Sequence, residues 1–206
     1  MIRIHHIEGR RSERIAWLLE ELDQPYELVF KSGDVLGSFA DLAAHHPMHM
    51  APIVEHDGVT MIESGAIIDY ILRRYGDGRL APQADAPDYQ RYVQYLHFAE
   101  GSAMPRIAPH FIAMLRGKPP REGRDRDQLR DMMTFLDAEL AARPYFAGAA
   151  FSAADIMMEF PLKLVVRLPE GLKANPHVRA HLDRIYVRAA YQRMIARALP
   201  NGPPAI

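Results

Sequence analysis

Apolar and polar residues follow two different periods in the first third of the chain. Between Ser12 and Leu22 the apolar residues recur at helical spacing, which predicts an amphipathic helix. Short apolar runs at Ile2–His6 and Tyr26–Phe30 predict a strand on each side of that helix. A weak helical pattern covers Phe39–His45, and a stronger one covers Ser64–Tyr75. Strands and helices therefore alternate over the first 75 residues.

Two further apolar runs lie between these last helices. They flank Asp57-Gly58, and Asp-Gly between apolar runs predicts an antiparallel hairpin. The first run begins at Pro52, which has no N–H to donate, so we expect it at a sheet edge or a bulge. The backbone of Ala51 would then face outward and pair with an extended peptide ligand, and a cis bond to Pro52 would help to aim it.

The rest of the chain is predicted to be helical. The Gly- and Pro-rich stretch before it predicts a linker at 79–87, between an α/β domain at 1–78 and an all-α domain at 88–206. Pro105 and Pro109 should kink or loosen the first long helix. We expect helices at Asp88–Leu115, Arg126–Ala142, Ser152–Val166, Pro176–Tyr186 and Ala189–Ala198.

Composition narrows the function classes. The 206 residues are 49% hydrophobic with a net charge of −1, which leaves no electrostatic footprint for nucleic acid. No apolar run is long enough to cross a membrane and the N-terminus lacks a signal-peptide core, so we expect a cytoplasmic protein. The absence of cysteine excludes disulfides, thiolate metal sites and a cysteine nucleophile. Any thiol chemistry must therefore use a thiol carried by the ligand.

Two helix starts carry candidate chemistry. Ser64 lies where a helix presents free backbone N–H groups, which suits a carboxylate, although a simple N-cap is the commoner use of such a serine. Gly9, Arg10, Arg11 and Ser12 lead from a strand into a helix, and the helix dipole there would favour a bound thiolate. The competing reading is that Ser12 only caps the helix and the arginines are solvated.

Histidines cluster in two places. His45, His46 and His49 share one loop, and His5-His6 end the first strand. Imidazoles at such spacing can bind a metal ion. Because no carboxylate lies at a regular offset from them, we expect no metal.

Several stretches, in this order, resemble one family. They are SERIAWLLEEL, HPMHMAPI and ESGAI, followed by YLHFAEGSAMP and FSAADIMM. In the last, Ser152 and Asp155 fit a capping box, with Phe151 and Ile156 placed as a hydrophobic staple. The set resembles a bacterial and fungal branch of the glutathione transferases. The resemblance implies a thioredoxin-like N-terminal domain followed by an all-α helical-bundle C-terminal domain.

The resemblance also implies a glutathione site. The backbone of Ala51, before Pro52, should pair with the cysteinyl part of glutathione. Glu63 and Ser64 should hold the γ-glutamyl end, with its carboxylate on the helix N-terminus. Glutathione is then the co-substrate, and a small apolar electrophile is its reaction partner.

Two departures from the family pattern concern catalysis and binding. The serine that serves the thiolate in the related branch aligns with Arg10, so Ser12, Arg10 or backbone amides must take its role. Met50 stands where a lysine commonly meets the glycyl carboxylate, and His49 is a possible substitute donor. Losing a charge-assisted hydrogen bond costs about 1.5–3 kcal/mol of binding.

The resemblance places the electrophile pocket in the second domain, lined by Tyr92, Tyr95, Glu100 and Met104. It implies a homodimeric glutathione S-transferase of the detoxification type, in which Glu100 could instead face the partner subunit's peptide site. The alternatives are a glutathione-dependent peroxidase, dehalogenase, isomerase or ether-cleaving enzyme on the same fold, or a non-catalytic binding or regulatory relative.

Overall fold

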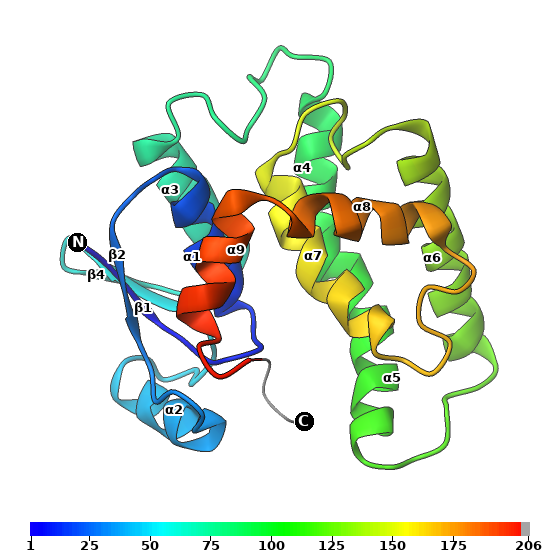
Figure 1. Ribbon diagram of the computed structural model, residues 1–206, viewed down its shortest axis with the longest axis horizontal. Coiled ribbons are helices and arrows are strands. Elements are labelled where there is room, and N and C mark those ends of the chain that lie inside the picture. Colours follow the sequence, from blue (N-terminus) through cyan, green and yellow to red (C-terminus); the bar gives the residue numbers. More distant parts are fainter. Residues whose placement is uncertain (203–206) are drawn as a thin grey trace. The chain divides into compact units, whose positions relative to one another are not determined.

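A computed structural model describes residues 1–202, and the chain divides into two compact units (Figure 1). One unit comprises residues 1–79 together with 186–202, and the other comprises residues 80–185. Within residues 1–202 every helix is too short or too polar to span a lipid bilayer. The two units are described in turn.

The first unit is built on a four-stranded mixed sheet. Its strands are β1 (Ile2–His5), β2 (Tyr26–Val29), β3 (Ile53–His56) and β4 (Val59–Met61), in the order β2-β1-β3-β4. β1 runs parallel to β2, whereas β3 is antiparallel to both of its neighbours. The helices are α1 (Ser12–Glu21), α2 (Val35–Asp41) and α3 (Ser64–Tyr75). This arrangement confirms the predicted thioredoxin-like domain.

The second helix of this unit begins earlier than its pattern predicts. We expected Phe39–His45, but α2 begins at Val35 and is followed by a 3-10 turn over Leu42–Ala44. The reason is a cap, because the Asp34 carboxylate accepts a hydrogen bond from the backbone N–H of Gly37 at 2.8 Å.

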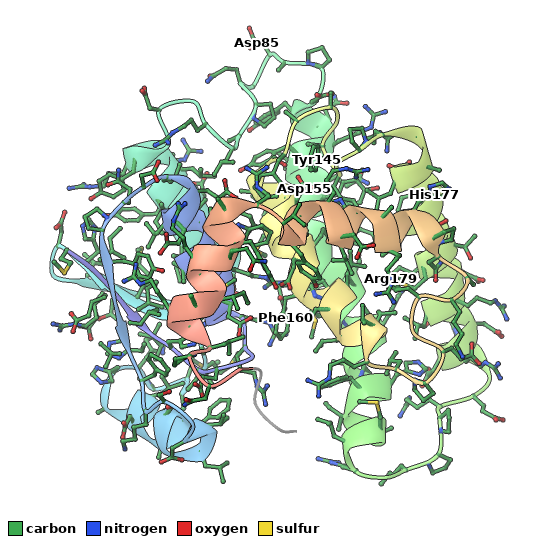
Figure 2. The ribbon with its side chains drawn as sticks, in the orientation of Figure 1. Asp85, Tyr145, Asp155, Phe160, His177 and Arg179 are labelled. Atoms are coloured by element: carbon green, nitrogen blue, oxygen red, sulfur yellow. The ribbon has the colours of Figure 1, made fainter. Side chains whose placement is uncertain are left out.

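The second unit is helical, as predicted. Its helices are α4 (Tyr89–Phe98), α5 (Met104–Leu115), α6 (Arg124–Ala142), α7 (Ala153–Val166) and α8 (Pro176–Tyr186), which ends at the unit boundary. At the start of α7, where Figure 2 labels Asp155, the predicted capping box is present. The Asp155 carboxylate accepts hydrogen bonds from the backbone N–H groups of Ser152 and Phe146, both at 2.9 Å. This buried carboxylate joins the helix start to the preceding loop.

The predicted long helix is interrupted. A π-helical turn over Ala99–Ala103 separates α4 from α5. Pro105 cannot donate to the carbonyl of Gly101, four residues earlier, so the regular bonding fails upstream of the proline. The helix restarts at Met104, which puts Pro105 in a first turn, where a missing N–H is tolerated.

The last helix, α9 (Ala189–Ala198), belongs to the first unit and packs on α1 (Figure 1). Trp17 meets the edge of the Tyr191 ring at a centroid distance of 4.9 Å. The Arg193 guanidinium binds the Glu20 carboxylate at 2.7 Å. The sequence assigned the tail to the helical domain, because the apolar face of α9 does not reveal which unit it covers.

Candidate functional site

Three loops meet at one end of the sheet because of the strand register. In the β3–β4 pair Val54 lies opposite Met61, so the same register continued outward brings Pro52 opposite Glu63. In the β1–β3 pair His5 lies opposite Ile53, and the same continuation brings Ile7 opposite Ala51. Ala51 packs against a buried cluster that contains Ile7, Leu42 and Ile53. The turn after β1, the loop before β3 and the start of α3 therefore lie at the same end of the sheet.

The loop before β3 contains a cis peptide bond between Ala51 and Pro52. Pro52 was expected at a sheet edge or a bulge, but β3 pairs with a strand on both sides. The proline is tolerated because it precedes Ile53, the first paired residue, so the ladder does not need its N–H. Ala51 is half-buried, and Met50 beside it is 53% exposed.

The start of α3 presents backbone N–H groups that the helix itself does not use. Glu63, not Ser64, occupies the N-cap position, with an unusual positive φ of 70°. Among the described residues its side chain makes no capping hydrogen bond to the helix. The first intrahelical bond runs from the N–H of Ile67 to the carbonyl of Glu63, so the N–H groups of residues 64–66 precede the regular ladder. The N-cap reading of Ser64 is therefore wrong, and the helix end suits a carboxylate.

Ser12 lies inside the protein. It is fully buried, and its hydroxyl lies 2.8 Å from His6 Nδ1 and 3.1 Å from the backbone nitrogen of Ile7. Since His6 Nε2 lies 2.8 Å from the carbonyl of Ala198, it must carry a proton and donate. In neutral His6, Nδ1 then accepts a hydrogen bond from the Ser12 hydroxyl, and the Ser12 oxygen in turn accepts a hydrogen bond from the backbone N–H of Ile7. Ser12 thus links β1 to the start of α1.

Arg10 lies in the turn that Ser12 closes. Gly9 adopts a positive φ of 70°, and its N–H donates to the Glu13 carboxylate at 2.7 Å, which fixes the turn. The Arg10 guanidinium donates to the carbonyl of Gly9 at 3.1 Å and lies 5.9 Å from the centre of the Phe39 ring. Its side chain is partly exposed at this end of the sheet.

Most of the residues predicted to meet the electrophile belong to the core of the helical unit. Tyr92, Tyr95 and Met104 are buried. The Tyr95 hydroxyl donates to Glu139 at 2.7 Å, and burial together with this bond raises the pKa of Tyr95. Glu100, on the π-helical turn, is half-buried. Within this unit, Glu100 is the member of the set with a more accessible side chain.

Sequence comparisons identify both halves of the chain. Residues 5–79 match the family model for the glutathione S-transferase N-terminal domain, and residues 119–184 match that for the C-terminal domain. Glutathione S-transferase 3 of Schizosaccharomyces pombe is 36% identical over 180 residues, which cover 79% of this chain and 73% of that protein. The chain belongs to the glutathione S-transferase family. Glutathione S-transferase 1 of Saccharomyces cerevisiae is 27% identical, with 80% of each chain covered.

Solved glutathione S-transferases share the fold. One from Actinobacillus pleuropneumoniae superposes with a TM-score of 0.83 at 24% identity, covering 98% of this chain and 94% of that one. A sphingomonad glutathione S-transferase, solved in complex with glutathione, gives a TM-score of 0.75 at 25% identity, with 97% and 98% covered. These likenesses support the two-domain reading made from the motifs.

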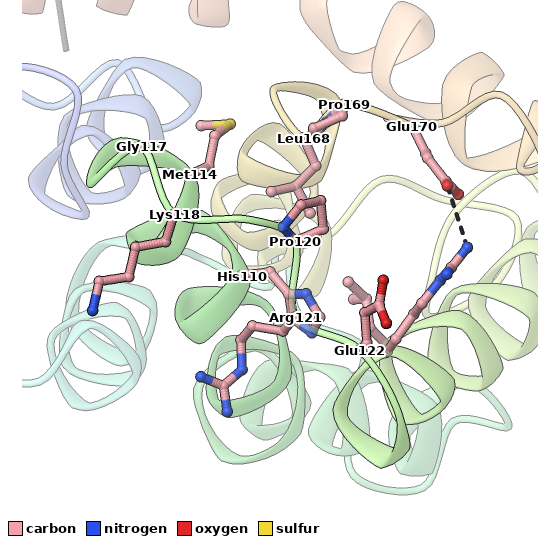
Figure 3. A pocket seen from close by; sticks show the side chains of 12 residues that line it. His110, Met114, Gly117, Lys118, Pro120, Arg121, Glu122, Leu168, Pro169 and Glu170 are labelled. Carbon is pink, nitrogen blue, oxygen red and sulfur yellow. Dashed lines mark ion pairs between the residues drawn. The ribbon is translucent and has the colours of Figure 1, made fainter.

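A cavity of this family member lies within the helical unit. It measures about 400 Å³ and lies where the end of α5, the α5–α6 connection and the loop after α7 meet (Figure 3). Met114, Leu129 and Leu168 contribute apolar surface, and Arg126 pairs with Glu170 at 3.5 Å on its rim. Among the described residues that line it, none belongs to the set predicted for the electrophile.

Proposed function

We propose that this protein is a glutathione transferase that binds glutathione at the end of the sheet where the turn after β1, the loop before β3 and the start of α3 meet. The observation that carries the proposal is the start of α3, where backbone donors lie beyond the reach of the helix ladder in a chain of this family. The γ-glutamyl carboxylate accepts hydrogen bonds from the backbone N–H groups of residues 64–66, which follow Glu63, and the Ser64 side chain lies beside it. The backbone of Ala51, before Pro52, pairs with the cysteinyl part of glutathione, which places the thiol toward the turn after β1.

The thiolate partner that we propose is Arg10, together with backbone N–H groups of its turn. Ser12 was the other candidate, but its hydroxyl is buried and bonded to His6 and Ile7. A guanidinium charge lowers the pKa of a nearby thiol because it stabilises the charged form. The thiol proton passes to solvent, and the sulfur lone pair forms the C–S bond while the leaving group departs with its electron pair.

The far end of glutathione is held more weakly in this proposal. Met50 offers no charge to the glycyl carboxylate, and His49, exposed with a positive φ of 49°, is the nearest alternative donor. On the electrophile side, Glu100 is the residue that we retain from the predicted set, and it could equally face the peptide site of a partner subunit. We propose a cytoplasmic homodimer, by analogy with the family.

The proposal is tested by conjugation of glutathione to an activated aromatic chloride, measured for the wild type, Arg10→Ala and Arg11→Ala. The two variants remove the same charge from adjacent positions of one turn, so Arg11→Ala is the matched control. We expect Arg10→Ala to lower kcat about 10- to 100-fold, the equivalent of one charge-assisted hydrogen bond. Arg11→Ala should retain most of the wild-type kcat.

The other outcomes separate the alternatives. Equal activity of both variants would transfer the thiolate role to the backbone amides alone. Saturable glutathione binding without turnover of aromatic chlorides would favour a peroxidase, dehalogenase, isomerase or ether-cleaving activity, or a non-catalytic relative. Neither binding nor turnover would refute the proposed function.

A further inference from the structure

Three potential metal ligands, none of them among the proposed glutathione contacts, meet on one face of the sheet. His5 lies on β1 and Glu55 on β3. Glu55 pairs with Arg3, and Arg3 and His5 are alternate residues of one strand, so the side chains of His5 and Glu55 lie on the same face of the sheet. His45, directly after the 3-10 turn, reaches the same carboxylate. His5 Nε2 lies 3.0 Å and His45 Nδ1 lies 3.2 Å from the same oxygen, Glu55 Oε1.

We propose that His5, His45 and Glu55 bind a divalent transition-metal ion of the zinc class. One ligand atom from each residue lies within 4.8 Å of the other two. Ligand atoms on a tetrahedral zinc ion, bound at about 2.0–2.1 Å, are separated by roughly 3.3 Å. The observed 3.0 and 3.2 Å separations from Oε1 are close to that spacing. Two imidazoles and one carboxylate form a common zinc donor set.

The surroundings of the cluster combine a fixed ligand with two adjustable ones. His5 is 3% exposed and fixed by the strand, while Glu55 and His45 are half-buried and border solvent. The second carboxylate oxygen, Glu55 Oε2, accepts from Arg3 at 3.5 Å, which orients the group in the way that outer hydrogen bonds orient metal ligands. Water can complete the coordination from the open side.

Binding requires one local movement. The rings of His5 and His45 lie 3.7 Å apart with a 30° tilt, closer than two imidazoles on one tetrahedral ion. The partly exposed His45 ring must therefore swing outward, while His5 and Glu55 keep their places on the sheet. The ion then takes the position of the two imidazole N–H protons that now face Oε1, and it links the start of the loop at 45–52 to β1 and β3.

The experiment is a titration of the metal-free 206-residue chain with Co²⁺, followed by visible d–d absorption. We expect one equivalent to give the intense bands of a four-coordinate site. His45→Ala and Glu55→Gln should weaken Co²⁺ binding at least tenfold. Added Zn²⁺ should displace Co²⁺ and abolish the absorption bands. His49→Ala is the matched control, because His49 is an exposed histidine of the same loop outside the cluster, and its titration should equal that of the wild type.

Thermal unfolding gives a second readout. Zn²⁺ at about 100 times its Kd should raise the Tm of the wild type by roughly 5–10 °C, and the same Zn²⁺ concentration should raise that of His45→Ala by about half as much or less. No saturable absorption, or equal binding by wild type and His45→Ala, would overturn the proposal and leave the cluster as a hydrogen-bonded His–Glu–His unit. The titration contains no glutathione, so its failure is distinguishable from failure of the proposed transferase function.

Discussion

Replacing Ser12 by alanine separates its structural role from a catalytic one. The substitution removes the hydroxyl that is hydrogen-bonded to two buried groups, the Nδ1 of His6 and the backbone N–H of Ile7. An unpaired buried polar group costs about 1–3 kcal/mol, so for two groups we expect a loss of at least about 2 kcal/mol in the free energy of unfolding. For a chain of this size that corresponds to a Tm lower by at least about 4 °C.

Calorimetry or circular dichroism measures the Tm, and a conjugation assay well below that temperature measures kcat. Because the Ser12 hydroxyl is bonded inside the protein, kcat should change by less than about twofold, a difference of under 0.5 kcal/mol in activation free energy. Ser32→Ala removes a hydroxyl that contacts Glu8 and Asn201 at an exposed position, so it should leave kcat unchanged and change the Tm by less than about 2 °C. An unchanged Tm with a large loss of kcat in Ser12→Ala would refute the reasoning and return the thiolate role to Ser12.

Three further predictions follow from particular contacts. Met50→Lys should lower the Kd for glutathione about tenfold in a calorimetric titration, whereas Met48→Lys, at a residue of similar exposure (56% against 53%), should not; equal effects would point to general charge. Burial alone would raise the pKa of Glu20, but hydrogen bonds from Arg193, Tyr26 and Arg197 outweigh it and lower that pKa below 4.5. Glu20 therefore contributes stability above pH 4.5 that is lost as the pH falls through its folded pKa. The Tm of Glu20→Gln should fall less than that of the wild type below pH 4.5. Parallel curves of Tm against pH for the two proteins would contradict this. Asp155→Ala should lower the unfolding free energy by at least about 2 kcal/mol in urea denaturation, because its backbone partners are buried, and a smaller loss would show that the capping box is not needed.

The elements that the sequence predicts well are those with a local cause. Helical spacing located α1 and α3 within a residue or two, and the capping box around Asp155 marked the start of α7. The early start of α2 also has a local signal, Asp34 followed three residues later by Gly37, which a search for N-caps would have found. Pro105 predicted an irregular helix, although the interruption lies upstream, where the missing hydrogen bond would have ended.

The features that the sequence does not reveal depend on long-range register. Glu55 lies 50 residues from His5, and only the pairing of β3 with β1 brings the two side chains together. The burial of Ser12 depends on His6 and on α9, whose Ala198 lies 192 residues from His6. Residue types and local spacing therefore found the loops of the candidate site, while the role of each side chain within them depended on which partners the fold supplies.

Calorimetric titration of the wild-type protein with glutathione and with the dipeptide Cys-Gly tests the central claim most directly. The dipeptide lacks the γ-glutamyl carboxylate that we place at the start of α3, so it should bind at least about tenfold more weakly, a loss of about 1.4 kcal/mol or more. Saturable binding of glutathione at millimolar or lower concentration, with this preference, is the predicted result. No binding of glutathione at 10 mM (about ten times a Kd of about 1 mM), or equal affinity for the two ligands, would contradict the account.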